Sequence, residues 1–367
     1  MSEQRITISL STLLWIVGMT LLLILLWQLR SLVITFMVAV ILASALAPIV
    51  DGAERLRVPR WLGVILVYLS FVGGLTGGIF LIGPTVLDQI QGLITQLPIY
   101  LNHLVDLTEN LIGKLSETQA ALIRQSLDIQ SLNAWAIRSG QQLVLRSYSV
   151  TRGILGGVFS VILTLLISGY MVADSQTLIK GLVRLFPQPW DERLSEQVEP
   201  VSQRMGGYLR GRILVSVILG VATTAGLSLV GLPQFAIGLG VIAGVTNLIP
   251  FVGPFLGAFP ALLVALGQGG WTFGWVLLLF LILQNLETYV LDPLLAGAAA
   301  GVHPLYQLLA VLGGAQVLGI IGALVVPPWV AGIAALVENL YLKPKLSAER
   351  KAARTQTKLP STSLSVP

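Results

Sequence analysis

Residues 247–260 read NLIPFVGPFLGAFP, and this stretch decides how the chain folds. It holds three prolines and two glycines, the residues that most disfavour a continuous helix. Yet it lies inside residues 213–286, a run of 74 residues without Asp, Glu, Lys, Arg or His. The presence of helix breakers inside the most apolar part of the chain therefore needs a physical reason.

Composition places the chain in a membrane. Hydrophobic residues make up 55% of it and charged residues 11%, and the mean hydropathy is +0.85. Soluble domains carry about 25% charged residues. A spanning helix needs about 20 apolar residues, so the uncharged run holds about three spans. Because the apolar runs are continuous rather than alternating, helices are favoured over a β-barrel. The sequence predicts an all-α polytopic membrane protein with about eight transmembrane helices.

Changes in polarity along the chain predict four regions. The polar region after the third span has leucines at helical spacing, which predicts an extramembrane helical hairpin. The last region is basic and then rich in Ser, Thr and Pro, a composition that predicts a disordered tail. The predicted regions are three N-terminal spans at 1–84, ending at Pro84; the helical insert at 85–150; a transmembrane core at 151–345 with a polar segment at 174–212; and the tail at 346–367.

Basic residues predict the orientation. Lys and Arg are dense in residues 51–60, in 174–212 and in the tail, and sparse in 85–150. Because cytoplasmic loops carry the excess of Lys and Arg, we expect both termini in the cytoplasm and the insert outside. The formal charge of +5 therefore does not indicate a nucleic-acid partner.

Several function classes are disfavoured by what the sequence lacks. It has no cysteine and only two histidines, His103 and His303, so neither a thiolate nor a histidine metal site is expected. It has no phosphate-binding loop and no serine-elbow or His-Glu-x-x-His motif. We therefore expect neither an enzyme nor a protein that uses a cofactor or ATP directly.

The prolines of the opening stretch predict a broken helix. Residues 235–267 as one helix would be about 50 Å long, against a hydrocarbon core of about 30 Å. Pro250 and Pro254 each remove an amide donor, and Gly253 lets the backbone turn. A break at 249–254 frees carbonyls that must be buried or line a watery cavity.

Transporters use such breaks to expose helix ends to their substrates. A plain proline kink is the alternative interpretation. A second break is predicted at 325–328, where Pro327 and Pro328 interrupt the last apolar stretch.

Polar residues cluster directly after the uncharged run. Glu287 is the first charged residue after the run, and Asp292 follows five residues later. A carboxylate near a membrane span is costly to bury and is a candidate for ion or proton coupling. The alternative is that Glu287 lies at the level of the lipid headgroups and only marks the end of a helix. His303 is either a titratable group or a loop residue before a proline. The predicted transport path comprises Asn247, Pro250, Gly253, Pro254, Gln284, Glu287, Asp292, Pro293, His303, Pro304 and Pro327.

Three stretches carry a resemblance to a known family. NLIPFVGPFLGAFPALLVAL (247–266), QNLETYVLDPLL (284–295) and GVHPLYQLLAVLGGAQVLGIIGALVVPP (301–328) resemble the AI-2E family of bacterial membrane transporters. The resemblance extends over roughly residues 10–345.

The resemblance implies a homo-oligomer with about eight transmembrane helices in the bacterial cytoplasmic (inner) membrane. Some members of such a family export a small polar, autoinducer-2-like solute, and others exchange sodium or lithium for protons. A secondary transporter is thus the leading hypothesis. A passive channel and a non-transporting membrane scaffold are the alternatives.

Overall fold

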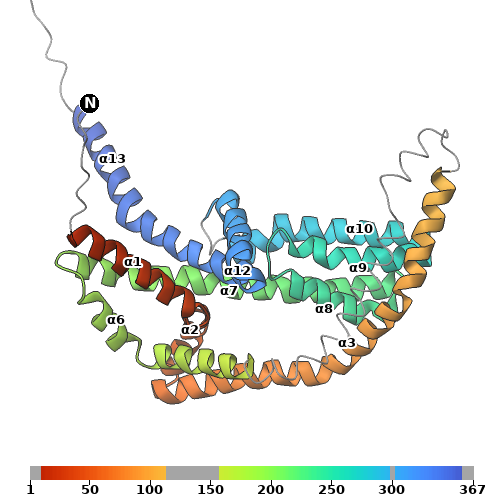
Figure 1. Ribbon diagram of the computed structural model, residues 1–367, viewed down its shortest axis with the longest axis horizontal. Coiled ribbons are helices and arrows are strands. Elements are labelled where there is room, and N and C mark those ends of the chain that lie inside the picture. Colours follow the sequence, from red (N-terminus) through yellow and green to blue (C-terminus); the bar gives the residue numbers. More distant parts are fainter. Residues whose placement is uncertain (1–9, 113–156, 298–301, 358–367) are drawn as a thin grey trace, which may run out of the picture.

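The computed structural model describes residues 10–112, 157–297 and 302–357, and it is built of helices (Figure 1). No strand occurs in these ranges, so the all-α prediction is confirmed. Besides a helix at Gly157–Ala173, the elements are α1 (Leu10–Gln28), α2 (Arg30–Arg55), α3 (Arg60–Ile112), α6 (Ser175–Val183), α7 (Trp190–Leu229), η1 (Pro233–Phe235), α8 (Ala236–Thr246), α9 (Gly253–Gln268), α10 (Gly270–Leu286), η2 (Glu287–Gly297), α12 (Pro304–Val337), η3 (Glu338–Leu342) and α13 (Lys343–Thr357).

Five helices of the described part are long and apolar enough to cross a membrane. The count rises to six if Gly157–Ala173 and α6, which meet at 83°, form one bent span. The predicted count of eight is thus not confirmed, because several apolar segments are short. Helix α8 has 11 residues and α9 has 16, or about 17 and 24 Å, and neither alone matches a hydrocarbon core of about 30 Å.

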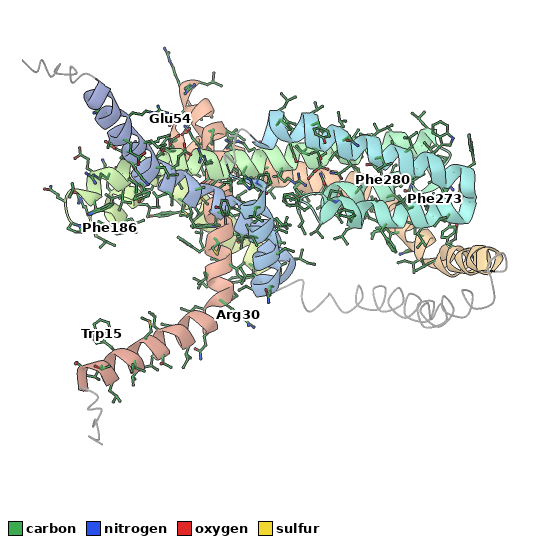
Figure 2. All side chains as sticks on the ribbon, turned by 90° about the horizontal axis from the view of Figure 1, so that it is seen from above. Trp15, Arg30, Glu54, Phe186, Phe273 and Phe280 are labelled. Atoms are coloured by element: carbon green, nitrogen blue, oxygen red, sulfur yellow. The ribbon has the colours of Figure 1, made fainter. Side chains whose placement is uncertain are left out.

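Apolar side chains on the outside of the helices fit a lipid surround. Figure 2 shows α1 extending away from the body, with Trp15 exposed on it. The buried side chains instead lie where helices cross. One core joins the ends of α3, α7, α8, α9 and α10 around Leu227, Leu239 and Val276, and a second joins α2, α7 and α12 around Ile41, Met205 and Val325.

Helix α7 is the central element of the fold. It is 40 residues long and packs against α2, α8, α10, η2 and α12. It meets α2 at Gly206, where an added methyl group would collide with the carbonyl of Ser44. Pro48 leaves that carbonyl without its helical donor, and Arg210 donates to Ser44 O and Ala45 O at 3.2 and 2.8 Å. The crossing thus satisfies a backbone group that lipid would leave unpaired.

The predicted break at 249–254 is confirmed. Helices α8 and α9 pack against each other as a hairpin, joined by a turn over residues 247–252. The freed carbonyls are not left open, because Ile249 N donates to Thr246 O at 3.0 Å and Val252 N donates to Pro250 O at 2.7 Å. The turn therefore satisfies its own backbone.

The predicted break at 325–328 is wrong in position. The helical path runs through Pro327 and Pro328, and α12 instead turns at Gly319, whose φ of 66° favours glycine. Methyl groups added to Gly314 and Gly322 would each collide with the other's carbonyl, so α12 folds back on itself there. Both prolines are buried, and packed neighbours allow a membrane helix to tolerate proline.

Two further expectations are corrected. Helix α3 does not end at Pro84, because it is anchored on both sides: Tyr68 hydrogen-bonds Ser168, and Gln89 Oε1 accepts from Gly238 N at 2.7 Å. The tail, predicted to be disordered from residue 346, is helical through Thr357. It is rich in good helix formers and extends an existing helix, so it needs no new nucleus.

The two polar regions of the chain differ in how much of each the structure describes. The polar segment at 174–212 is helical in α6 and in the first part of α7, which continues into the uncharged run. Most of the predicted insert, at 113–150, lies outside the described residues.

The hairpin in α12 yields a test with a neighbouring control. We expect Gly314→Ala to lower the stability by about 1–3 kcal/mol, the usual range for overpacking. Gly313→Ala should be neutral or slightly stabilising, because nothing lies within 4 Å of an added methyl group there. Thermal unfolding of both variants in detergent measures the difference, and equal melting temperatures would contradict the hairpin.

Candidate functional site

The two charges that flank the uncharged run meet inside the structure. Arg212 ends the charged part of α7, and Glu287 is the next charged residue along the chain. Arg212 Nη1 lies 3.0 Å from Glu287 Oε1, and the two side chains are only 5% and 6% exposed. The 74 uncharged residues therefore begin and end at this ion pair.

Two more side chains complete the cluster around Arg212. Its Nη1 also donates to Asp292 Oδ1 at 3.3 Å, and its Nη2 donates to Asn247 Oδ1 at 3.2 Å. Asn247 is buried and begins the turn between α8 and α9. The break in the opening stretch therefore delivers a polar side chain to the centre of the protein, from an element separate from those that carry the charges.

A change of helix type places both carboxylates on one guanidinium. Helix α10 passes at Glu287 into η2, a π-helical segment that contains Pro293. In an α-helix, residues five apart lie about 140° apart around the axis. In a π-helix residue i bonds to residue i+5, which brings Glu287 and Asp292 to similar faces. Such segments are frequent at functional sites.

The cluster carries an excess of negative charge. One arginine faces two carboxylates, which gives a formal charge of −1, while Asp292 is less enclosed, with its side chain 40% exposed. Buried charge is tolerated only when it is paired. A proton or a monovalent cation would balance the excess. No group of three His, Asp or Glu side chains suited to hold a metal occurs in the described part.

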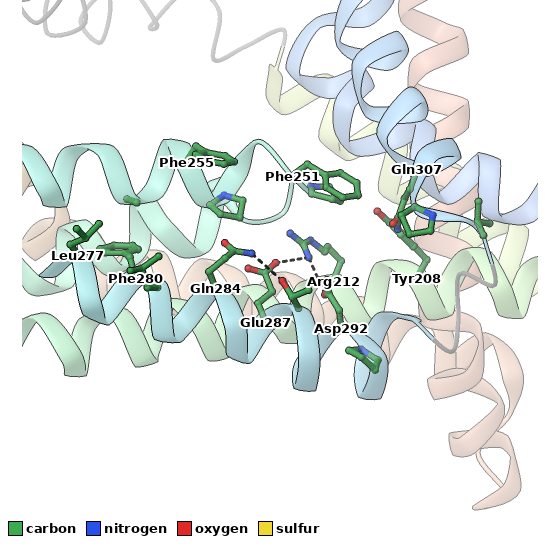
Figure 3. A pocket seen from close by; sticks show the side chains of 18 of the residues that line it. Tyr208, Arg212, Phe251, Phe255, Leu277, Phe280, Gln284, Glu287, Asp292 and Gln307 are labelled. Atoms are coloured by element: carbon green, nitrogen blue, oxygen red, sulfur yellow. Dashed lines mark hydrogen bonds and ion pairs between the residues drawn. The ribbon is translucent and has the colours of Figure 1, made fainter. Parts of the chain in front are cut away.

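A cavity of about 970 Å³ opens beside the cluster. Figure 3 shows Arg212, Glu287, Asp292 and Gln284 gathered in its middle, with Phe255, Phe280 and Leu277 toward one end and Tyr208 and Gln307 toward the other. It lies among α7, the α8–α9 turn, α9, α10, η2 and the start of α12. The cavity thus has a charged centre and an apolar extension.

The structure brings most of the predicted path together. Asn247 hydrogen-bonds Arg212, and Gly253 packs tightly against Thr246 O at the turn. The predicted residues that line the cavity are Pro250, Pro254, Gln284, Glu287, Asp292, Pro293 and Pro304.

Four predicted path residues do not line the cavity: Asn247 and Gly253, which lie at the turn beside it, and His303 and Pro327. His303 is exposed and starts α12, where its Nδ1 accepts from Leu305 N at 3.2 Å. Pro327 is buried in the second limb of α12. His303 is thus a helix cap, and Pro327 is a packing residue.

Sequence reasoning missed Arg212, Tyr208 and Gln307. Arg212 counts among the basic residues of 174–212 that indicate a cytoplasmic segment, yet it is the residue on which the cluster converges. One signal was present in the sequence. Arg212 and Glu287 have opposite charges and flank the longest uncharged run. Two such charges are expected to pair in a membrane, because each is costly to bury alone. Nothing in the pattern around Tyr208 or Gln307 marks them.

Comparison with known proteins gives a consistent result. A family model described as AI-2E family transporter matches residues 14–342. YrrI and YueF of Bacillus subtilis, named as provisional transport proteins, are each 29% identical, over 82% and 84% of this chain and 84% of each relative. PerM of Escherichia coli, named as a provisional permease, is 26% identical over 75% of this chain and 78% of the length of PerM.

The ion pair predicts a pattern of stability. Arg212→Met leaves two carboxylates without their cation, and we expect it to cost about 3–5 kcal/mol, as for other broken buried pairs. Adding Glu287→Met should recover much of that loss, because one uncompensated charge is removed. Arg184→Met, at an exposed arginine, should change stability by less than about 0.5 kcal/mol. Unfolding in detergent compares the stability of these variants. An Arg212→Met variant as stable as the wild type would show that the pair is not formed.

Proposed function

Because the chain belongs to the AI-2E family of transporters, we propose that it is a secondary transporter of the bacterial cytoplasmic membrane, with Glu287 as its coupling group. The transported species is a small polar, autoinducer-2-like solute that is exported, or sodium or lithium exchanged for protons. Basic residues in 51–60, 174–212 and α13 favour cytoplasmic termini.

The observation that carries the proposal is the Arg212–Glu287–Asp292 cluster at the centre of a cavity. A protein that only spans a membrane has no need of a buried arginine and two carboxylates, which are costly there. Broken helices beside such a group are the usual construction of transporter binding sites. Here the α8–α9 turn supplies Asn247 and Pro250, and the start of α9 supplies Pro254.

Charge balance gives the cluster a means of coupling. With a formal charge of −1, the site is neutralised by one proton or by one monovalent cation, but not by both together. Each species then favours the other's release, which is the requirement for exchange. A differential affinity of this kind is what allows one ligand to shift a site between states.

A passive channel needs the same cavity without coupling, and a scaffold needs neither. The buried charges favour the transporter over both. Channel activity would appear as downhill flux without concentrative uptake, and a scaffold would show no flux.

The test is cation-driven proton flux in proteoliposomes with a trapped pH-sensitive dye. Adding sodium or lithium outside the wild-type vesicles should change the internal pH. We expect Glu287→Gln to reduce the rate at least about tenfold, equivalent to 1.4 kcal/mol. Glu192→Gln makes the same chemical change at an exposed position of α7 and should behave as wild type.

The readings of this experiment are distinct. A folded Glu287→Gln variant with unchanged exchange would exclude Glu287 as the coupling group. Absence of any response in the wild type would count against cation–proton exchange, and uptake of polar solutes would be measured next.

A further inference from the structure

We propose that the cavity binds a monovalent organic cation with an apolar or aromatic body, and that Asp292, rather than Glu287, meets its charge. This inference rests on the proposed transport function, keeps its coupling to protons, and names an amphipathic organic cation in place of the small polar solute as the ligand of the same site. It follows from the size and lining of the cavity, its opening and the different environments of the two carboxylates.

The cavity is much larger than an ion requires. Its volume of about 970 Å³ is at the upper end of the roughly 300–1,000 Å³ typical of small-molecule sites. Polar groups occupy only part of its wall. The apolar extension is formed by Phe255, Leu262, Leu277, Phe280 and Leu281, whereas Phe251 lies nearer Arg212 (Figure 3). A bare cation or a small polar solute would leave this extension without a partner, whereas an amphipathic ligand would fill it.

The apolar extension reaches the outer surface of the helices, and we infer that it opens there toward lipid. Phe255 of α9 is 78% exposed and Leu281 of α10 is 52% exposed, although both line the cavity. Both lie in the run of residues 213–286 that contains no charge, so this opening faces the hydrocarbon region. A ligand with an apolar body concentrates there and has direct access to the cavity. A strongly hydrated solute does not.

The two carboxylates differ in how they are held. Glu287 is 6% exposed and lies 3.0 Å from Arg212 Nη1, so its charge is already matched. Asp292 shares that nitrogen at the longer distance of 3.3 Å, and its side chain is 40% exposed. Asp292 is therefore the carboxylate with room for a second partner. An incoming cation at Asp292 would cancel the excess charge of the cluster without breaking the buried pair.

Aromatic side chains favour a cation over a neutral ligand of the same shape. Phe251, Phe255 and Phe280 all line the cavity. The face of an aromatic ring attracts a cation, and it does so more strongly where water is excluded. An anion of the same shape would meet both these faces and the surplus carboxylate. The site should therefore discriminate by sign of charge.

Two ions of nearly equal shape and opposite charge test the proposal: tetraphenylphosphonium and tetraphenylborate. Binding to the purified full-length protein in detergent is measured by equilibrium dialysis, with protein-free micelles subtracted. We expect the wild type to bind the phosphonium at least about tenfold more tightly than the borate, a difference of 1.4 kcal/mol. Asp292→Asn should remove this preference, and Asp292→Glu should restore it.

Matched variants separate the charge from the apolar wall. Phe280→Ala should weaken binding of both ions, and Glu192→Gln should leave it unchanged. Gel filtration and thermal unfolding establish that each variant is folded. Equal binding of the two ions by the wild type, or an undiminished preference in folded Asp292→Asn, would overturn the proposal.

Failure of this inference and failure of the proposed function give different results. If Glu287-dependent flux is present but the phosphonium does not bind selectively, the transporter stands and the substrate class is wrong. If selective binding depends on Asp292 but neither the ions nor the phosphonium is moved across vesicles, the binding site stands and transport is wrong.

Discussion

The ion pair between Arg212 and Glu287 is the constraint on which the rest of the structure depends. An isolated charge at membrane depth is among the costliest groups a chain can bury. These two charges are separated by 74 uncharged residues. Each lowers the cost of burying the other only if the intervening chain folds back and brings the two side chains together. The α8–α9 hairpin and α10 provide that return path, and Asn247, Asp292 and the cavity are assembled around the pair.

The same accounting applies to the backbone. Prolines in α2 and in the α8–α9 turn free carbonyl groups, and each is satisfied inside the protein, by Arg210 for Ser44 and by turn amides for Thr246 and Pro250. The carbonyls that these prolines free are therefore already paired within the protein. The breaks shape the chain so that side chains reach the cavity, and the polar chemistry of the site is carried by Arg212, Glu287 and Asp292.

Membership of a transporter family and the geometry of the site support each other at different levels. The family indicates that something crosses the membrane but leaves the solute open. The geometry bears on what the site accepts, through a charged centre with a surplus carboxylate and an apolar wall that reaches lipid. A fold alone does not fix function, so the substrate is inferred from these side chains.

The sequence by itself determined the membrane class, the all-helical architecture, the break at 249–254 and the gathering of polar residues around Glu287. These follow from local signals, namely hydropathy over about 20 residues and the backbone chemistry of Pro and Gly. The tertiary structure alone decided that Arg212 is the partner of Glu287, that α12 turns at Gly319 rather than at Pro327, and that α3 continues through Pro84. The physical reason is the same in each case. Pairing across 75 positions and tolerance of a proline depend on which neighbours pack there, and no local pattern records those neighbours.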